Sequence, residues 1–151
     1  MDMKLELVVV PVADVDRAKA FYVDRVGFHL DVDHRGEGDF RVVQMTPPGS
    51  ACSITVMSPA SDAAGSLQGL HLVVSDIEAA RAELVGRGVD VSPVFHCESG
   101  FACRYGEPGE FGRRAPGPQP QRATYASFAT FADPDGNEWV LQEITTRLPG
   151  R

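Results

Sequence analysis

Histidine and cysteine are the side chains of this sequence best suited to bind metals or carry protons, and it contains 4 His and 3 Cys. His96, Cys97 and Cys103 stand close together and suggest a zinc site. Their spacing matches no C-x2-C pattern, however, and a fourth ligand is missing. The odd number of cysteines also predicts no disulfide framework. The cluster is therefore a weak zinc candidate.

His71 lies in GLHLVVSD, a β-branched run that predicts a strand. On a strand this side chain either binds a ligand, acts as a general base, or is a buried histidine satisfied by a backbone carbonyl. His29 and His34 stand near charged turns, and we expect both to be solvated.

The most recognisable motif is DPDGN, residues 133–137. Proline restricts φ, glycine adopts positive φ, and Asp and Asn side chains bond to nearby backbone. The motif therefore predicts a turn rather than a catalytic group, followed by a strand in NEWVLQEI.

Charge and hydropathy exclude several classes of partner. A net charge of −7 and a pI near 5.0 argue against nucleic acid, which requires a basic surface. Arg113 and Arg114, together with Arg104, either bind an anion over a pocket or lie in a disordered loop.

No apolar run is long enough for a membrane helix. The beginning, MDMKLELVVVPVAD, is typical of a first strand rather than a signal peptide, so we expect a cytoplasmic protein.

Two successive sets of elements must position these residues. In the first, LELVVVPVAD predicts a strand, and DVDRAKAFYVDRVGF predicts a helix capped by Asp14 and ended by Gly27. Val15, Ala18, Tyr22 and Val26 fall on one face of that helix. Three strands follow, in HLDVDH, FRVVQM and ACSITVM.

The second set begins after the small, polar stretch SPASDAAGS, which is typical of a linker. GLHLVVSD predicts a strand, and IEAARAELVGRG predicts a helix with Ile77, Ala80 and Leu84 inward. Ser75 and Glu78 form a possible capping box. VDVSPVFH, YASFATFAD and NEWVLQEI predict the remaining strands.

The two sets are an internal repeat. Val12-Ala13-Asp14 aligns with Val74-Ser75-Asp76, and TPPGSACSIT aligns with DPDGNEWVLQ. The two aligned segments lie further apart in the second set than in the first, because the second set has an insertion between about His96 and Arg122. An insertion of this length predicts a lid or a disordered loop. We expect one α+β domain of two βαβββ modules, at about 3–58 and 67–146, joined by a linker at 59–66. The modules would form a curved eight-stranded sheet around a cavity, with the helices on the outer face.

These motifs resemble the glyoxalase/bleomycin-resistance/extradiol-dioxygenase group, the vicinal oxygen chelate superfamily. The resemblance covers nearly the whole chain and rests on VADVDRAKAFYVDRVGF, VVSDIEAARAELVGRGV and FADPDGNEWVLQEI. It implies the fold above, but not one activity, because the group includes isomerases, lyases, dioxygenases, thiol transferases and drug-binding proteins. Its enzymes hold a divalent ion with His and Glu from the first and last strands of the modules.

The resemblance marks four positions where such ligands would stand. They are Leu7 and Gly69, seven residues before Asp14 and Asp76, then Val140, four residues after Gly136, and Ser53 by the internal repeat. None is a histidine or a carboxylate. The usual metal site is therefore predicted to be absent.

Side chains two apart on a strand share a face. Two residues along from the vacant positions lie Val9, Thr55, His71 and Gln142. We expect Thr55, His71 and Gln142 to converge on a pocket otherwise lined by apolar residues such as Leu7, Val9 and Val140. Gln142 either binds the ligand or pairs with Thr55 or His71, and Thr55 is more readily explained as structural.

Other residues near this pocket are weaker candidates. Gln44 lies in a predicted strand of unknown facing, and Tyr125 stands beside the long insertion. Trp139 and Leu141 alternate with Val140 and should face the helices as core residues.

Two function hypotheses follow. The first is a protein without cofactor that binds a small aromatic or carbonyl-rich molecule, either to sequester it or to transform it through His71. The alternative is a divalent-metal lyase, isomerase or dioxygenase with a relocated site, in which His71 is joined by Glu138 or Glu143, Glu138 being the better placed. The resemblance also suggests a homodimer.

Overall fold

The computed structural model describes residues 1–98 and 113–149, and its contacts divide the chain into two compact units. Residues 1–68 with 132–138 form the first unit, and the described residues of 69–131 and 139–149 form the second. Residues 132–138, which contain the DPDGN turn of the second module, therefore belong to the first unit.

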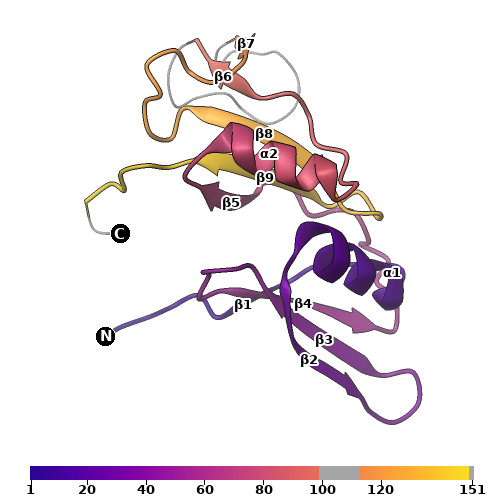
Figure 1. Cartoon of the computed structure of the whole chain (residues 1–151). Coiled ribbons are helices and arrows are strands. Elements are labelled where there is room, and N and C mark those ends of the chain that lie inside the picture. The colour runs from indigo at the N-terminus through magenta and orange to yellow at the C-terminus, as the bar shows by residue number, and fades with distance from the viewer. Residues whose placement is uncertain (99–112, 150–151) are drawn as a thin grey trace. The chain divides into compact units, whose positions relative to one another are not determined.

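The first unit is a four-stranded sheet with one helical segment (Figure 1). The strand order is β1-β4-β3-β2; β1 runs parallel to β4 and the other pairs are antiparallel. Its elements are β1 (Leu7–Val9), α1 (Val15–Ala20), η1 (Phe21–Val26), β2 (His29–Arg35), β3 (Arg41–Thr46) and β4 (Ser53–Ser58).

The helical segment begins and ends where the sequence predicts. The Asp14 carboxylate accepts a hydrogen bond from the Arg17 amide at 3.0 Å, and Gly27 ends the segment at φ +90°. Its second half, η1, is a π-helix, which the hydrophobic pattern did not predict. Val15, Ala18 and Tyr22 are buried as expected.

The two faces of this sheet differ in burial. Val43, Met45, Ile54 and Val56 are buried, and Arg41 on the same face as Val43 reaches Asp16 of α1, so the helix covers that side. The opposite side, which we call the helix-free face, carries alternating residues of all four strands: Leu7, Val9, Val32, Val42, Gln44, Thr46, Ser53, Thr55 and Met57.

The second unit is a five-stranded sheet with the order β5-β9-β8-β6-β7, and α2 lies along it (Figure 1). Strands β5 and β9 are parallel, and β6 pairs antiparallel with β7 and β8. The elements are β5 (Leu70–Val74), α2 (Ile77–Gly86), β6 (Phe95–Cys97), β7 (Arg114–Pro116), β8 (Ser127–Ala132) and β9 (Glu138–Glu143).

Three local predictions need correction. The N-cap of α2 is Asp76 rather than Ser75, and its carboxylate accepts hydrogen bonds from the amides of Glu78 and Ala79. VDVSPVFH is a strand only at its end, because Pro93 has no amide hydrogen to give to a ladder. Strand β7, inside the insertion, is a strand that the sequence pattern did not reveal.

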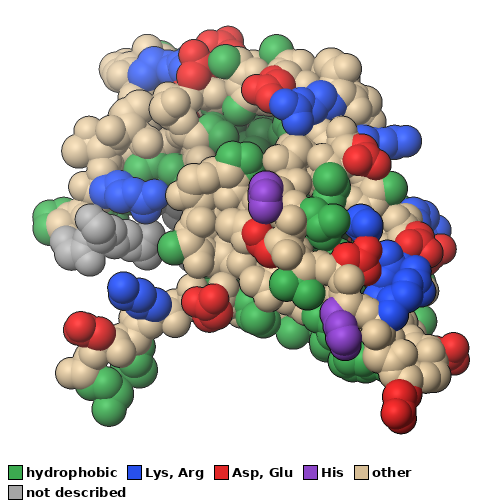
Figure 2. All heavy atoms as spheres, turned by 60° about the horizontal axis from the view of Figure 1, so that its bottom comes forward, with side chains coloured by type: hydrophobic (Ala, Val, Ile, Leu, Met, Phe, Trp, Pro, Cys, Tyr) green, Lys and Arg blue, Asp and Glu red, His purple; other side chains and the backbone are tan. Residues whose placement is uncertain are grey.

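The predicted α+β class with two βαβββ modules is confirmed. Across residues 1–98 and 113–149, none of the helices combines the length and the apolar character needed to cross a bilayer. On the face drawn in Figure 2, acidic and basic side chains are interspersed with hydrophobic ones.

Candidate functional site

His71 and Gln142 are joined by a hydrogen bond on neighbouring strands of the second unit. Gln142 Oε1 lies 3.0 Å from His71 Nδ1, and Gln142 Nε2 donates to the Tyr125 carbonyl at 3.0 Å. Because the amide nitrogen is engaged by a carbonyl, Oε1 must be the atom that faces the ring, and His71 Nδ1 must carry the proton. A neutral His71 therefore accepts hydrogen bonds or a proton at Nε2, which suits either ligand binding or general-base chemistry.

Tyr125 is buried and has a left-handed backbone conformation, with φ +68°. Its phenol oxygen accepts from the Leu148 amide at 3.1 Å, while its own amide donates to the Glu143 carbonyl. These bonds and that of Gln142 give Tyr125 a role in holding the end of β9 in place. They do not test its predicted place at a pocket mouth.

A second polar chain crosses the helix-free face of the first unit. Thr46 Oγ1 lies 2.5 Å from Asp31 Oδ2 and 2.7 Å from Ser53 Oγ, and Gln44 Nε2 donates to Ser53 Oγ at 3.2 Å. A β-bulge between Leu30 and Val32 turns Asp31 toward this face, so alternation along the strand did not reveal it. The hydrogen bond from Thr46, and then that from His29, lower the pKa of Asp31.

Thr55 lies on the same face, in the same unit as Gln44 and Ser53. It is 5% exposed, and its hydroxyl oxygen has no hydrogen-bond partner among the described residues. Val9, its Cα partner on β1, is 47% exposed. Gln44, whose facing the sequence left open, is thus assigned to the helix-free face.

Two of the four positions marked as vacant metal sites, Ser53 and Val140, hold side chains that make contacts of their own. Ser53 is hydrogen-bonded as above, and Leu7 is its Cα partner on β1. Val140 is fully buried in a cluster with Phe95, Cys97 and Phe128. Gly69 has φ +77°, a conformation that disfavours any residue with a Cβ.

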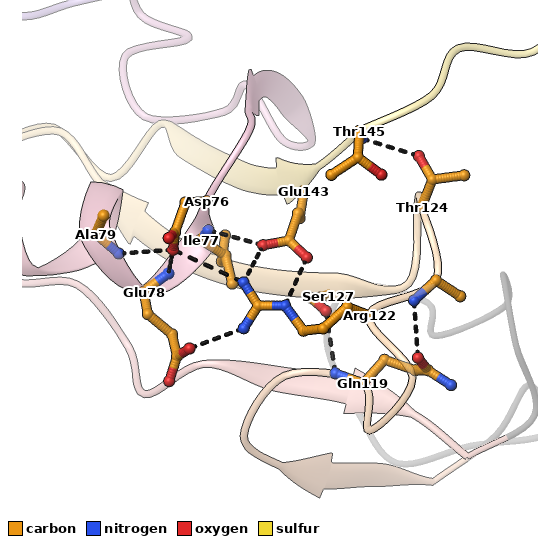
Figure 3. Close-up of polar contacts among 11 residues, drawn as sticks. Asp76, Ile77, Glu78, Ala79, Gln119, Arg122, Thr124, Ser127, Glu143 and Thr145 are labelled. Carbon is orange, nitrogen blue, oxygen red and sulfur yellow. Dashed lines mark hydrogen bonds and ion pairs between the residues drawn. The ribbon is translucent and has the colours of Figure 1, made fainter.

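Glu143, one of the carboxylates considered for a relocated metal site, is excluded from it by its contacts. Its side chain is 1% exposed and lies on the face of β9 opposite His71, since His71 is the Cα partner of Val140. Arg122 donates to both of its oxygens, at 3.0 and 2.6 Å, and the Ile77 amide donates to Oε2 (Figure 3). Glu143 thus fastens α2 to β9. Glu138 stays a half-buried residue at the start of β9.

The zinc hypothesis is also contradicted. Cys97 is disulfide-bonded and so offers no thiolate, and His96 Nδ1 lies 2.9 Å from the Gly117 carbonyl. That disulfide corrects the expectation from the odd cysteine count. Cys103 lies outside the described residues. Within the described part of the chain, no group of three or more His, Cys, Asp or Glu is arranged to hold a metal ion.

The arginines of the insertion are only partly described. Arg114 places its guanidinium 4.2 Å from the centre of the Phe95 ring, a cation–π contact, and Arg113 is exposed. Arg104 lies outside the described residues.

The DPDGN motif is a turn held by a buried carboxylate. Asp133 accepts hydrogen bonds from the Tyr22 hydroxyl at 2.7 Å and from the side chain and amide of Asn137. Gly136 has φ +101°. The carboxylate of Asp133 thus holds the turn together and ties it to Tyr22. The bond from Tyr22 joins residues far apart in the sequence, so residue spacing could not predict it.

A groove of about 360 Å³ lies elsewhere in the second unit, beside the first turns of α2. Its two charged residues are engaged: Arg81 donates to the Ser92 carbonyl, and Glu78 accepts from Arg122. The groove is lined by Glu78, Arg81, Pro93, Val94, Pro116, Gly117 and Pro118, none of which is a predicted site residue.

Comparison with known families gives one match that spans most of the chain. Residues 4–141 match the model described as the Glyoxalase/Bleomycin resistance protein/Dioxygenase superfamily. The chain belongs to this superfamily. No curated protein matches the chain.

Solved structures of the superfamily include similar proteins. TnmS3, an antibiotic binding protein from Streptomyces sp. CB03234, is 30% identical with a TM-score of 0.63, over 95% of this chain and 97% of that one. A glyoxalase/bleomycin resistance protein from the same organism is 32% identical with a TM-score of 0.62, over 93% and 100%. A superfamily member from Sphaerobacter thermophilus, 24% identical with a TM-score of 0.63 over 94% and 98%, supports the fold alone.

The residues at the superfamily's metal positions do not fit a divalent ion. A carboxylate or imidazole at each position would bind the ion, whereas Leu7 and Val140 offer only hydrocarbon and Gly69 has no side chain. The Ser53 hydroxyl is engaged by Thr46 and Gln44. No chemical step is therefore assigned to a metal at these positions.

Proposed function

We propose that this protein binds a small aromatic or carbonyl-rich organic molecule without a metal ion and sequesters it. One observation carries the proposal: non-ligating residues stand at all four positions where the superfamily places its metal ligands. The similarity to TnmS3, described as an antibiotic binding protein, adds support because it covers 95% of the chain.

The side chains near those positions suit such a ligand. In the first unit, Leu7 and Val9 are partly exposed apolar groups on the edge strand β1, and covering them with an apolar ligand is favourable by about 25 cal/mol per Å² buried. In the second unit, neutral His71 donates to Gln142 from Nδ1, so its Nε2 can accept a hydrogen bond from a ligand hydroxyl. Few polar groups within an apolar lining are typical of sites for small organic molecules.

The proposal is tested by thermal-shift screening of metal-free protein against bleomycin, anthraquinones and quinolones, followed by titration calorimetry. A true ligand at about 100 times its Kd raises the free energy of unfolding by about 2.7 kcal/mol. Failure of the whole panel to bind metal-free protein, together with binding after addition of Mn²⁺, Ni²⁺ or Zn²⁺, would refute metal-free binding.

Sequestration is distinguished from catalysis by the fate of the ligand. We expect chromatography to recover the ligand chemically unchanged after prolonged incubation with the protein. If a product forms instead, His71→Asn tests the general-base role, since loss of a general base lowers rates by about 10²–10⁴-fold. An unchanged rate would remove His71 from the chemistry.

A cytoplasmic location and a homodimer are further parts of this proposal. Cell fractionation tests the location, and light scattering coupled to size-exclusion chromatography tests the dimer. A monomer over the micromolar range would contradict the dimer without affecting metal-free binding.

A further inference from the structure

One row of residues crosses all four strands of the helix-free face at the same level. Val9, Thr55, Gln44 and Val32 are successive Cα partners from β1 through β4 and β3 to β2. The two polar residues occupy the middle of the row. The valines at its ends are 47% and 43% exposed. The row thus places hydrogen-bonding groups, one of them the buried Thr55 hydroxyl, between two apolar side chains.

The orientation of the Gln44 amide follows from the polar chain beside this row. Asp31 is a carboxylate and can only accept, so Thr46 must donate its single hydroxyl proton to Asp31. The contact between Thr46 and Ser53 then requires Ser53 to donate. With its proton committed, Ser53 can only accept in its contact with Gln44.

Gln44 must therefore direct its NH₂ group toward Ser53, and its carbonyl oxygen, Oε1, is available as an acceptor. A flipped amide would place two acceptors against each other. No hydrogen bond to Oε1 occurs among residues 1–98 and 113–149. The sheet thus carries an amide oxygen on Gln44 that the described residues leave free. The Asp31 carboxylate sets this orientation, because it fixes the direction of the hydrogen bonds through Thr46 and Ser53.

Thr55 supplies the complementary group. A buried hydroxyl without a partner costs free energy, and native proteins rarely contain one without a ligand, a water molecule or a functional reason. Thr55 and Gln44 are Cα partners on antiparallel strands, whose Cβ atoms typically lie about 4.5–5.5 Å apart. A donor and an acceptor on adjacent atoms of one ligand can reach both.

We propose that Gln44 and Thr55 recognise a planar bicyclic ligand bearing a cis N–H/C=O pair, as in an aromatic lactam. The ligand N–H donates to Gln44 Oε1, the Thr55 hydroxyl donates to the ligand carbonyl, and the rings contact Val9 and Val32. This inference rests on the proposed function and names its ligand class. Neighbouring strands lie about 4.8 Å apart, so the row spans about 14 Å, enough for two fused rings.

The decisive probe pair is 2-quinolone and N-methyl-2-quinolone, compared by titration calorimetry. Methylation removes the N–H donor and keeps the ring and the carbonyl. We expect N-methyl-2-quinolone to bind at least about tenfold more weakly, because it leaves Gln44 Oε1 unpaired and places a methyl group against it. Equal affinity for the two compounds would overturn the inference.

Thr55→Val is the matching protein variant, with Thr130→Val, a half-buried strand threonine of the second unit, as control. Removing an unpartnered hydroxyl should leave the melting temperature of the ligand-free protein unchanged or higher. Affinity for 2-quinolone should fall about 5- to 10-fold in Thr55→Val only, as expected for one neutral hydrogen bond. A Thr55→Val variant that is destabilised but binds with native affinity would show a purely structural role.

The outcomes separate this inference from the proposed function. If 2-quinolone fails to bind while bleomycin or an anthraquinone binds the metal-free protein, metal-free binding stands and the lactam pair is wrong. If neither the panel nor 2-quinolone binds the metal-free protein, and binding appears after addition of Mn²⁺, Ni²⁺ or Zn²⁺, both fail.

Discussion

At the scale of single residues, Arg122 and Glu143 show how a buried charge is stabilised in this protein. Glu143 is 1% exposed, and Arg122, at 38% exposed, donates to both of its oxygens (Figure 3). Arg122 also pairs with Glu78 at 2.8 Å. These carboxylates raise the pKa of Arg122, Glu78 contributing most through its hydrogen bond. One guanidinium thus links α2, β9 and the end of the insertion.

Arg122→Ala should lower the free energy of unfolding, measured by urea denaturation, by clearly more than the loss of an exposed ion pair does. Removing one partner of a buried pair leaves an uncompensated charge, and partial exposure of Arg122 moderates the cost. Arg87→Ala is the control, because its pair with Glu83 is an exposed i,i+4 contact worth about 0.5 kcal/mol or less. Similar losses in the two variants would contradict this account.

Asp33 makes stability depend on pH. Arg41 donates to both of its oxygens at 2.8 and 2.9 Å, Lys19 donates at 2.8 Å, and these bonds hold its pKa well below the ordinary value of 3.8. A carboxyl whose folded-state pKa is depressed contributes stability fully above its unfolded pKa of about 3.9, and this stability is lost as the pH falls below it.

Asp33→Asn should therefore be less stable than wild type at pH 7, with a smaller difference at pH 3. Urea denaturation at pH 7, 5 and 3 measures this. Asp90→Asn, at an exposed site of the second unit, should follow the wild-type curve. A constant difference between Asp33→Asn and wild type at every pH would show that the loss is not electrostatic.

At the scale of elements, the stretch 61–66 and the turn 133–137 support each other within the first unit. Asn137 accepts from the Leu67 amide and donates to the Pro11 carbonyl, and Glu138 donates to the Leu67 carbonyl. Gly65 has φ +78°, and a Cβ built there would lie 2.1 Å from the Asp135 carbonyl oxygen. The stretch predicted to be a linker is thus a packed loop.

Gly65→Ala should destabilise the protein by several kcal/mol, because backbone rather than a flexible side chain must move and positive φ is unfavourable for alanine. Gly86→Ala is the matched control. It lies at the end of α2 with nothing within 4 Å of the built Cβ, so thermal denaturation should show a gain of up to about 1 kcal/mol. Tolerance of Gly65→Ala would mean that the loop does not pack on the turn as described.

At the scale of the whole molecule, the vacant ligand positions predict behaviour toward metals. Protein purified without chelator should contain substoichiometric Mn, Fe, Ni and Zn by mass spectrometry, and EDTA should leave its melting temperature and ligand affinity unchanged. Stoichiometric metal that depends on His71, judged with His71→Ala, would instead support the relocated-site enzyme. Metal that depends on His34, tested by His34→Ala, would indicate binding at an exposed surface residue.

Much of the fold could be predicted because it depends on local patterns. Alternating and helical periodicities located the strands and helices, Asp14 and Gly27 marked the ends of a helix, and DPDGN predicted its turn. Predictions failed where a single residue overrode the pattern. Pro93 shortened β6, and the competing cap Asp76 displaced Ser75.

The sequence by itself determined the superfamily and the absence of ligating side chains at its metal positions, since both depend only on which residues stand at which spacing. Only the tertiary structure decided how the polar side chains are oriented. A bulge brings Asp31 to the helix-free face. Because Asp31 can only accept, it fixes the donor and acceptor in each hydrogen bond from Thr46 through Ser53 to Gln44. Such direction depends on distances between strands, which spacing along the chain does not specify.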